Sequence, residues 1–248
     1  MDTALTLVIL GAAAAGFVQG FSGTAFSMVA LAFWAWAVDP QTAGPMAVFG
    51  SLIGQLVALR ALRFSFKLRL VAPFVVGGVL GIPVGVWLLG YLDQTMFKAG
   101  LGLFLMSWCC VMLAGGELSL FRKADAVSDG FVGWMGGVMG GIGGLAGAVP
   151  TLWCTLRGWD RDTQRAVFQS FNLTMHIVTI AVYIASGMIT EDALVMFAII
   201  GPALLIPALI GLWLYGLTSA AGFRRVLYLL LFAAGLGLVS SSLPRLLA

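Results

Sequence analysis

The chain has 248 residues, of which 61% are apolar and only 9% are charged, and its formal net charge is +3. This composition excludes a water-soluble globular protein, and so small and scattered a charge excludes nucleic acid as a partner. The three cysteines, two of them adjacent, form neither a disulfide framework nor a metal motif. Continuous apolar runs without alternation predict an all-α integral membrane protein.

Eight apolar segments follow one another, and the links between them are too short for a soluble domain. We therefore expect a single integral membrane domain over residues 1–248. The segments cover 3–38, 42–60, 70–92, 95–115, 128–157, 163–188, 192–217 and 222–243. The first and fifth are longer than one crossing requires. Glycines interrupt both, at Gly20–Ser27 (GFSGTAFS) and Gly140–Gly147 (GGIGGLAG), which predicts a broken or re-entrant helical segment at each place.

An internal repeat brings the two interruptions into register when the chain is shifted by 121 residues. The shift pairs Gly20 with Gly141, Gly23 with Gly144, Asp39 with Asp160, Ser51 with Asn172 and Gln55 with His176. One broken segment followed by three helices thus occurs twice, over residues 1–116 and 127–248. This order indicates a duplication.

The distribution of basic residues favours inverted repeats. If each broken segment enters and leaves on one side of the membrane, eleven of the thirteen lysines and arginines face the cytoplasm. Only Lys98 and Arg245 then face outward. If the broken segments cross once instead, the split is seven to six, which the positive-inside rule disfavours. We therefore predict inverted repeats with both termini on the outer, non-cytoplasmic side of the membrane.

The glycine breaks are candidate anion sites, because a broken helix exposes backbone N–H groups and the positive end of its dipole. In the first break Gly20 and Gly23 permit the turn, and Ser22, Thr24 and Ser27 are candidate caps and donors. In the second, the amides of Gly143 to Gly147, with Gly144 between them, are the expected donors. Pro150 suits the first turn of the second half-helix. The alternative is close helix packing, which we expect at Gly77, Gly81, Gly85, Gly133 and Gly137.

Polar residues share one face of the helix after each break. Gln169, Asn172 and His176 are spaced i, i+3 and i+7, and the repeat matches the last two with Ser51 and Gln55. Polar groups at this depth are costly without partners and mark transport pathways, unless they only bond helices together. No Asp or Glu lies clearly within a spanning segment, which favours an anionic substrate.

Two groups of basic residues flank the predicted cytoplasmic ends. Arg157, Arg161 and Arg165 alternate with Asp160 and Asp162, and either steer anions toward the pathway or set topology by pairing with those aspartates. A second group contacts anionic lipid headgroups and sets orientation; it consists of Arg60, Arg63, Lys67 and Arg69.

These features together resemble the TauE/SafE sulfite exporter family over essentially the whole chain. The closest stretch is GGIGGLAGAVPTLWCTLRGWDRDTQRAVFQSFN, which begins at Gly140. The first half departs, because GFSGTAFSMVALAFWAW has less glycine than the family pattern and lacks its proline. The resemblance implies transport of sulfite, sulfonates or other small sulfur oxyanions, in a four-plus-four helix fold in the bacterial inner membrane.

The leading functional hypothesis is a secondary transporter that moves a small sulfur-containing anion by alternating access. Export is the expected direction, and coupling to protons through His176 or through a protonatable oxyanion is a hypothesis. The alternatives are a passive anion channel on the same fold and a metal-ion permease, the latter suggested by eleven methionines. We expect no enzymatic activity, cofactor, metal site or nucleic acid partner, and a homodimer is compatible with the sequence. The expected substrate-binding residues are Gly20, Ser22, Gly23, Thr24, Ser27, Ser51, Gln55, Gly143, Gly144, Gly147, Gln169, Asn172 and His176.

Overall fold

The computed structural model describes residues 3–23, 25–61, 67–114, 125–215 and 220–246, and within these ranges every regular element is a helix. The first five helices are α1 (Thr3–Ser22), α2 (Phe26–Trp34), α3 (Pro40–Ala61), α4 (Leu68–Tyr91) and α5 (Gln94–Ala114). The next five are α6 (Ala126–Gly143), α7 (Ala148–Leu156), α8 (Arg161–Ala185), α9 (Glu191–Tyr215) and α10 (Ala220–Leu246). The prediction of an all-helical protein is confirmed, and the helices match the eight expected segments.

Both long segments are broken into a long helix and a nine-residue helix, α1–α2 and α6–α7. Each break contains a glycine in the left-handed region, Gly23 with φ 74° and Gly144 with φ 70°. These two glycines are the pair that the shift of 121 residues aligns. Glycine adopts this conformation without the steric cost that a Cβ brings, so both turns suit their sequence.

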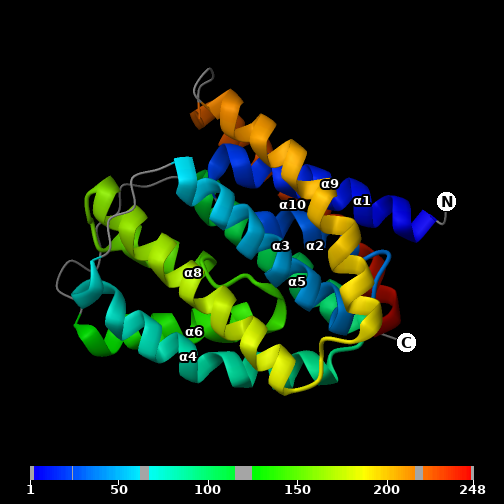
Figure 1. The fold of residues 1–248 in the computed structure, drawn as a ribbon, viewed down its shortest axis with the longest axis horizontal. Helices are drawn as coiled ribbons and strands as arrows, with labels where there is room; N and C mark the ends of the chain where they lie inside the picture. The colour runs from blue at the N-terminus through cyan, green and yellow to red at the C-terminus, as the bar shows by residue number, and fades with distance from the viewer. Residues whose placement is uncertain (1–2, 24, 62–66, 115–124, 216–219, 247–248) are drawn as a thin grey trace.

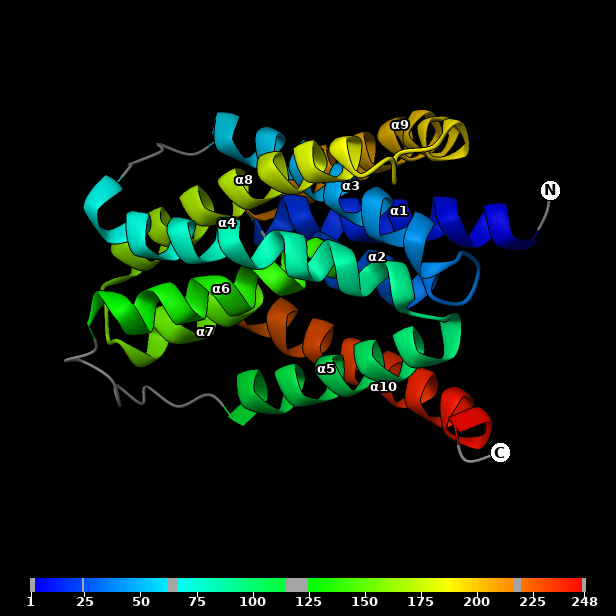
Figure 2. The same cartoon turned by 90° about the horizontal axis from the view of Figure 1, so that it is seen from below.

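Three pairs of helices make the main contacts of the bundle: α4 with α6, α1 with α9 and α5 with α10. The short helices and α3 and α8 lie between these pairs (Figures 1 and 2). Both termini lie toward the same end of the molecule. The first hairpin, α1–α2, has its open base at that end, whereas the base of α6–α7 lies at the opposite end.

Glycines let two of these pairs approach backbone to backbone. A Cβ added to Gly77, Gly81 or Gly85 of α4 would collide with backbone of α6, and one added to Gly133 or Gly137 would collide with backbone of α4. The packing role predicted for these five glycines is therefore confirmed. Gly20 plays the same part between α1 and α9, because its Cβ would meet the backbone of Ala208.

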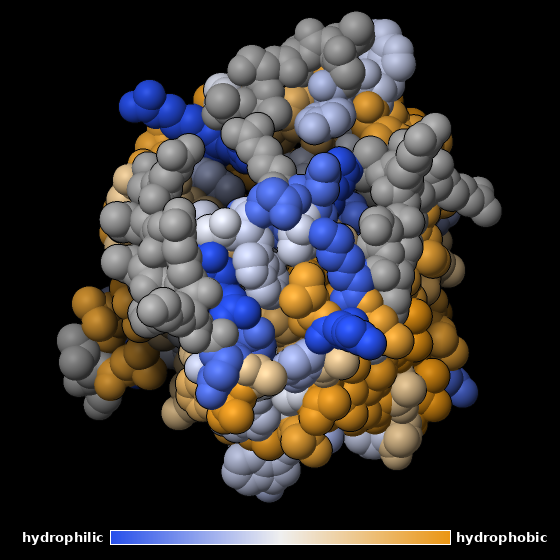
Figure 3. Space-filling view, turned by 90° about the vertical axis from the view of Figure 1, so that its left-hand side faces the viewer, coloured by the Kyte–Doolittle hydropathy of each residue, from blue (hydrophilic) through white to orange (hydrophobic). Residues whose placement is uncertain are grey.

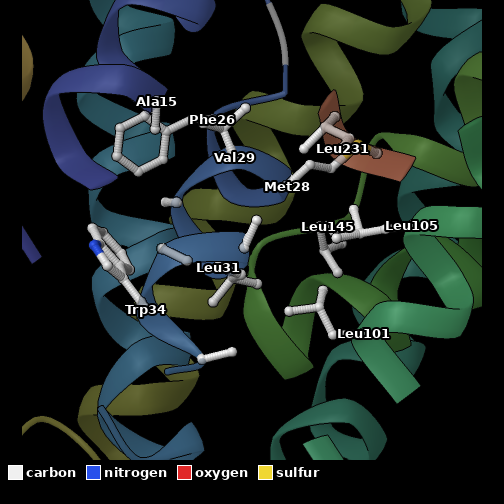
Figure 4. Packing of buried hydrophobic residues seen from close by; sticks show 14 of the residues in the cluster. Ala15, Phe26, Met28, Val29, Leu31, Trp34, Leu101, Leu105, Leu145 and Leu231 are labelled. Carbon is white, nitrogen blue, oxygen red and sulfur yellow. The ribbon is translucent and has the colours of Figure 1, made fainter. Parts of the chain in front are cut away.

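The short helix α2 forms the centre of the larger apolar cluster, with eight of its nine residues buried. Figure 4 shows Leu31 of α2 beside Leu145 of the α6–α7 turn, with Leu101 and Leu105 of α5 close by. The indole N–H of Trp34 donates to the Val8 carbonyl oxygen over 3.0 Å and ties the end of α2 to α1. Burial on this scale holds α2 in place inside the bundle.

Large apolar side chains cover the outside of the bundle. Leu80, Trp87, Ile206 and Leu230 are each at least 60% exposed, and so continuous an apolar surface fits contact with lipid tails rather than water. Six of the described helices are long and apolar enough to span a membrane: α1, α4, α5, α9 and most of α8 and α10. The chain is therefore a multi-pass membrane protein.

Candidate functional site

The two glycine breaks touch each other inside the bundle, although they are 117 residues apart in the chain. Ser27, in the first turn of α2, donates its hydroxyl to the Gly144 carbonyl oxygen over 3.0 Å. The same Oγ lies 2.7 Å from the hydroxyl oxygen of Ser51 on α3. Both serines are buried. The sequence expectation that these residues gather around both breaks thus agrees with their placement.

Helix α8 faces the second break from Asn172 to Tyr183, over about three of its turns. The amide of Asn172 lies against Gly147, where an added Cβ would collide with it. One turn further, Nε2 of His176 lies 3.4 Å from the Gly144 carbonyl oxygen, and the Tyr183 hydroxyl donates to the Gly141 carbonyl over 2.7 Å. Because a carbonyl only accepts, a hydrogen bond at this contact requires the proton of the neutral His176 ring to be on Nε2.

A bond between α3 and α8 completes the cluster. The Gln55 side-chain amide donates to the Gln169 carbonyl oxygen over 2.8 Å. We call the whole set the polar junction; it consists of Ser27, Ser51, Gln55, Gly144, Gly147, Gln169, Asn172 and His176. Seven of them are buried and Gly147 is half-buried, and none of the eight carries a permanent charge.

Three buried polar atoms on α8 have no hydrogen-bond partner among the described residues: Asn172 Oδ1, His176 Nδ1 and Thr179 Oγ1. Their spacing of i, i+4 and i+7 places them on one helix face, the face that meets the second break. Leaving a buried polar atom without a hydrogen-bond partner destabilises a protein by about 1–3 kcal/mol. Three such atoms on one helix face therefore indicate that a ligand or water binds there.

The backbone of the second break supplies fewer donors than expected. The N–H groups of Gly144 and Leu145 already donate to the carbonyl oxygens of Gly140 and Met139 at the end of α6. Gly143 belongs to α6 itself. In the described part of the chain, Ala146 and Gly147 form no hydrogen bond through their N–H groups. These two amides, which precede α7, are therefore the backbone donors that remain for a ligand.

The first break differs from the expectation in its capping. Ser22 donates to the Val18 carbonyl oxygen over 2.8 Å, and Ser27 lies inside α2, so neither caps that helix. Gln19 does so instead, because its Oε1 accepts the Phe26 N–H over 3.1 Å. Gly20 packs on α9 away from the turn, and Thr24 lies outside the described residues. At the first break the side chain of Gln19, and neither serine, thus accepts the first N–H of α2.

Comparison with known protein families gives one match that spans almost the whole molecule. The family model described as sulfite exporter TauE/SafE matches residues 8–238. The chain belongs to the TauE/SafE family. This confirms the family resemblance, and it makes the chain a member of a family of membrane transporters. Comparisons with curated proteins and with solved structures give no significant match.

The charged end of this TauE/SafE protein is organised by Asp129, near the start of α6. Its buried carboxylate lies 3.3 Å from the Arg157 guanidinium and accepts the Trp153 indole N–H over 2.7 Å. Arg157 also stacks on the ring of Trp159. The expected pairing of Arg157 with Asp160 and Asp162 is therefore wrong, because a carboxylate on the neighbouring helix is available. This ion pair joins the start of α6 to the end of α7 at the open base of the hairpin.

Asp160 has a different role in this TauE/SafE protein, as the N-cap of α8. It accepts hydrogen bonds from the hydroxyl and the backbone N–H of Thr163, and these hold the pKa of its carboxyl below the usual value. Lys67 donates to the same Thr163 hydroxyl over 2.6 Å. Figure 3 shows hydrophilic side chains gathered over the middle of this end of the molecule.

Sequence reasoning missed four polar residues that the fold of this TauE/SafE protein uses. They are Gln19, Asp129, Thr179 and Tyr183. Thr179 and Tyr183 continue the α8 face at i+3 and i+7 from His176, so extending the helical spacing would have found both. Among the described residues, no group of three or more His, Cys, Asp or Glu side chains is arranged to hold a metal.

Proposed function

We propose that this TauE/SafE protein is a secondary transporter that exports a small sulfur-containing oxyanion, sulfite or a sulfonate, by alternating access. The observation that carries the proposal is the contact between the two chain breaks through Ser27 and Gly144 inside the polar junction. Broken helices near the middle of a transporter are places where substrate meets backbone. The family match supports the sulfur chemistry of the cargo.

The donors of the polar junction suit an anion held without a lysine or arginine. The hydroxyl of Ser51, the amide of Asn172 and the N–H groups of Ala146 and Gly147 lie around the second break. The Ser27 hydroxyl and the His176 ring donate to the Gly144 carbonyl oxygen there, and a bound anion would take the place of that acceptor. Charge-assisted hydrogen bonds from such groups are stronger than neutral ones. The absence of a carboxylate from the junction removes the repulsion that an anion would meet.

We further propose that the two halves are inverted repeats with both termini on the periplasmic side of the bacterial inner membrane. Exchange of α1–α5 with α6–α10 turns the α1–α9 pair into α6–α4 and leaves α5–α10 unchanged, and all three pairs occur in the bundle. The hairpins α1–α2 and α6–α7 open toward opposite ends, as such an inversion requires (Figure 2). In this orientation the Asp129–Arg157 ion pair lies at the cytoplasmic end.

Flux measurements with purified protein in proteoliposomes test this function. We expect saturable movement of one of sulfite, thiosulfate, sulfate or a short sulfonate, with counterflow, because a carrier binds its cargo in each cycle. Chloride should not compete. Flux that rises linearly with concentration and shows no counterflow would indicate a passive channel instead, and movement of no sulfur anion would overturn the proposal.

Replacement of His176 with glutamine is expected to remove the response of that flux to a pH gradient. Histidine is the side chain that gains and loses a proton near neutral pH, and it is the only one of its kind in the chain. Glutamine keeps a donor for the Gly144 carbonyl oxygen. We expect the flux driven by a pH gradient to fall to the level without a gradient, while exchange of labelled anion continues. An unchanged response to the gradient would exclude His176 as the coupling group.

A further inference from the structure

The unpartnered atoms on α8 have a chemical character that restricts the form of the substrate. Nδ1 of His176 is an acceptor as long as Nε2 donates to the Gly144 carbonyl oxygen. Asn172 Oδ1 is an acceptor as well. Thr179 Oγ1 both accepts and donates. A bare oxyanion offers acceptors alone, so it would leave two of these three atoms without a partner.

The charges around the junction restrict the substrate in a second, independent way. The buried polar residues of the described chain include one carboxylate, Asp129, and no lysine or arginine. Asp129 is already paired with Arg157 at the base of the α6–α7 hairpin. The polar junction thus holds no fixed positive charge, and His176 is neutral while its Nδ1 serves as an acceptor. A dianion costs more free energy to bury in such a site than a monoanion does.

We infer that the polar junction takes a singly charged oxyanion that carries its own O–H group, such as hydrogensulfite, and that Thr179 contacts this group. The inference rests on the proposed function and specifies its substrate. The O–H of the anion donates its single proton to Thr179 Oγ1 or to the neighbouring acceptor His176 Nδ1. The remaining oxygens accept from the N–H groups of Ala146 and Gly147.

Thr179 was not among the site residues expected from the sequence. Its burial, its unbonded hydroxyl and its position on α8 place it beside the polar junction. Its side chain is fully buried, and its hydroxyl does not bond to its own helix. Thr174 and Ser170, on the same helix, do bond to the carbonyl oxygens four residues earlier. Thr179 lies between His176 and Tyr183, both of which bond to the second break. Its hydroxyl is therefore available to the substrate rather than to the backbone.

Two monoanions of nearly equal shape test the effect of the O–H group on binding while charge and size stay the same. Methanesulfonate has three bare oxygens, and methylphosphonate at mildly acidic pH has one O–H in place of an oxygen. We expect methylphosphonate to inhibit labelled sulfite uptake at a concentration about tenfold lower than methanesulfonate, the effect of one good hydrogen bond. The same order is expected for the rise in unfolding temperature that each probe gives the purified protein.

Threonine-to-valine variants locate the effect on α8. Thr179→Val keeps the shape and removes the hydroxyl, and should reduce the advantage of methylphosphonate to about threefold or less. Thr174→Val is the matched control, because its hydroxyl is occupied within the helix, and should leave the advantage unchanged. Equal inhibition of the native protein by the two probes would overturn the inference, as would a loss of the same size in both variants.

The two readouts keep the inference separate from the proposed function. Saturable sulfite uptake that both probes inhibit equally overturns the inference and leaves the transporter proposal standing. No saturable uptake overturns the transporter proposal, and the inference is then decided by the unfolding temperatures. If neither probe raises the unfolding temperature and no uptake is seen, both fall.

Discussion

Replacing Gly144 with alanine is expected to abolish saturable anion flux and to destabilise the protein by about 2–5 kcal/mol. The loss has two sources. Gly144 has a φ of 70°, which an L-residue adopts only at a steric cost, and its new Cβ would lie 2.6 Å from Ser27 Oγ. The collision falls on the bond that joins the two breaks. The measurements are thermal unfolding in detergent and flux in proteoliposomes.

Gly187→Ala is the matched control for this substitution. Gly187 has almost the same backbone conformation, with φ 71°, but open space surrounds the position of its missing Cβ. The variant therefore carries the backbone strain alone, about 1–2 kcal/mol, and should transport normally. Equal loss of flux in the two variants would show that contact of the breaks through Gly144 is not needed for transport.

Replacing Asp129 with alanine is the second substitution with a large expected effect, about 3 kcal/mol of lost stability. The side chains of Asp129 and Arg157 are only 7% and 10% exposed. Removal of the carboxylate leaves the guanidinium and the Trp153 indole N–H of the α6–α7 hairpin without this acceptor. Thermal unfolding of the purified protein measures the loss.

Two further variants show whether the effect belongs to the ion pair. Asp125→Ala, four residues earlier, removes an exposed carboxylate that only caps α6 through Ser128, and should cost much less. The double variant Asp129→Leu/Arg157→Met removes both charges and should recover part of the loss, because an apolar pair often replaces a buried ion pair at little cost. No recovery would mean that the Asp129 bond to Trp153, rather than the ion pair, holds the hairpin.

The sequence was sufficient to predict the helices and the two breaks, because lipid forces long apolar stretches to be helical and glycine runs resist helix formation. The shift of 121 residues also aligns Gly23 with Gly144, and these two glycines share one left-handed conformation. These patterns depend on residues that are close together in the chain, so a single sequence is enough to detect them.

The partners of polar residues could not be predicted in this way, because they depend on which helices become neighbours. Arg157 has two aspartates within five residues of it in the chain, yet its partner Asp129 is 28 residues away on α6. Likewise Ser22 is a good capping residue by type, but its hydroxyl donates to the Val18 carbonyl oxygen. The longer side chain of Gln19 accepts the Phe26 N–H instead. Gly20 sits in a glycine-rich run and serves helix packing, which becomes visible only once Ala208 lies against it.

The glycine contacts of α1 with α9 and of α4 with α6 have a mechanical consequence. Each contact joins a helix of the first half to a helix of the second, with backbone against backbone. The first and second halves of the chain are therefore tightly packed on each other. Neither half can move as a rigid body relative to the other without breaking the α1–α9 and α4–α6 contacts. The alternating access that we propose would therefore have to be carried by parts of the chain outside these two contacts. The nine-residue helices α2 and α7 are such parts. Asp129 holds the base of α7 through Arg157 and Trp153, and α7 has fewer buried residues than the deeply buried α2.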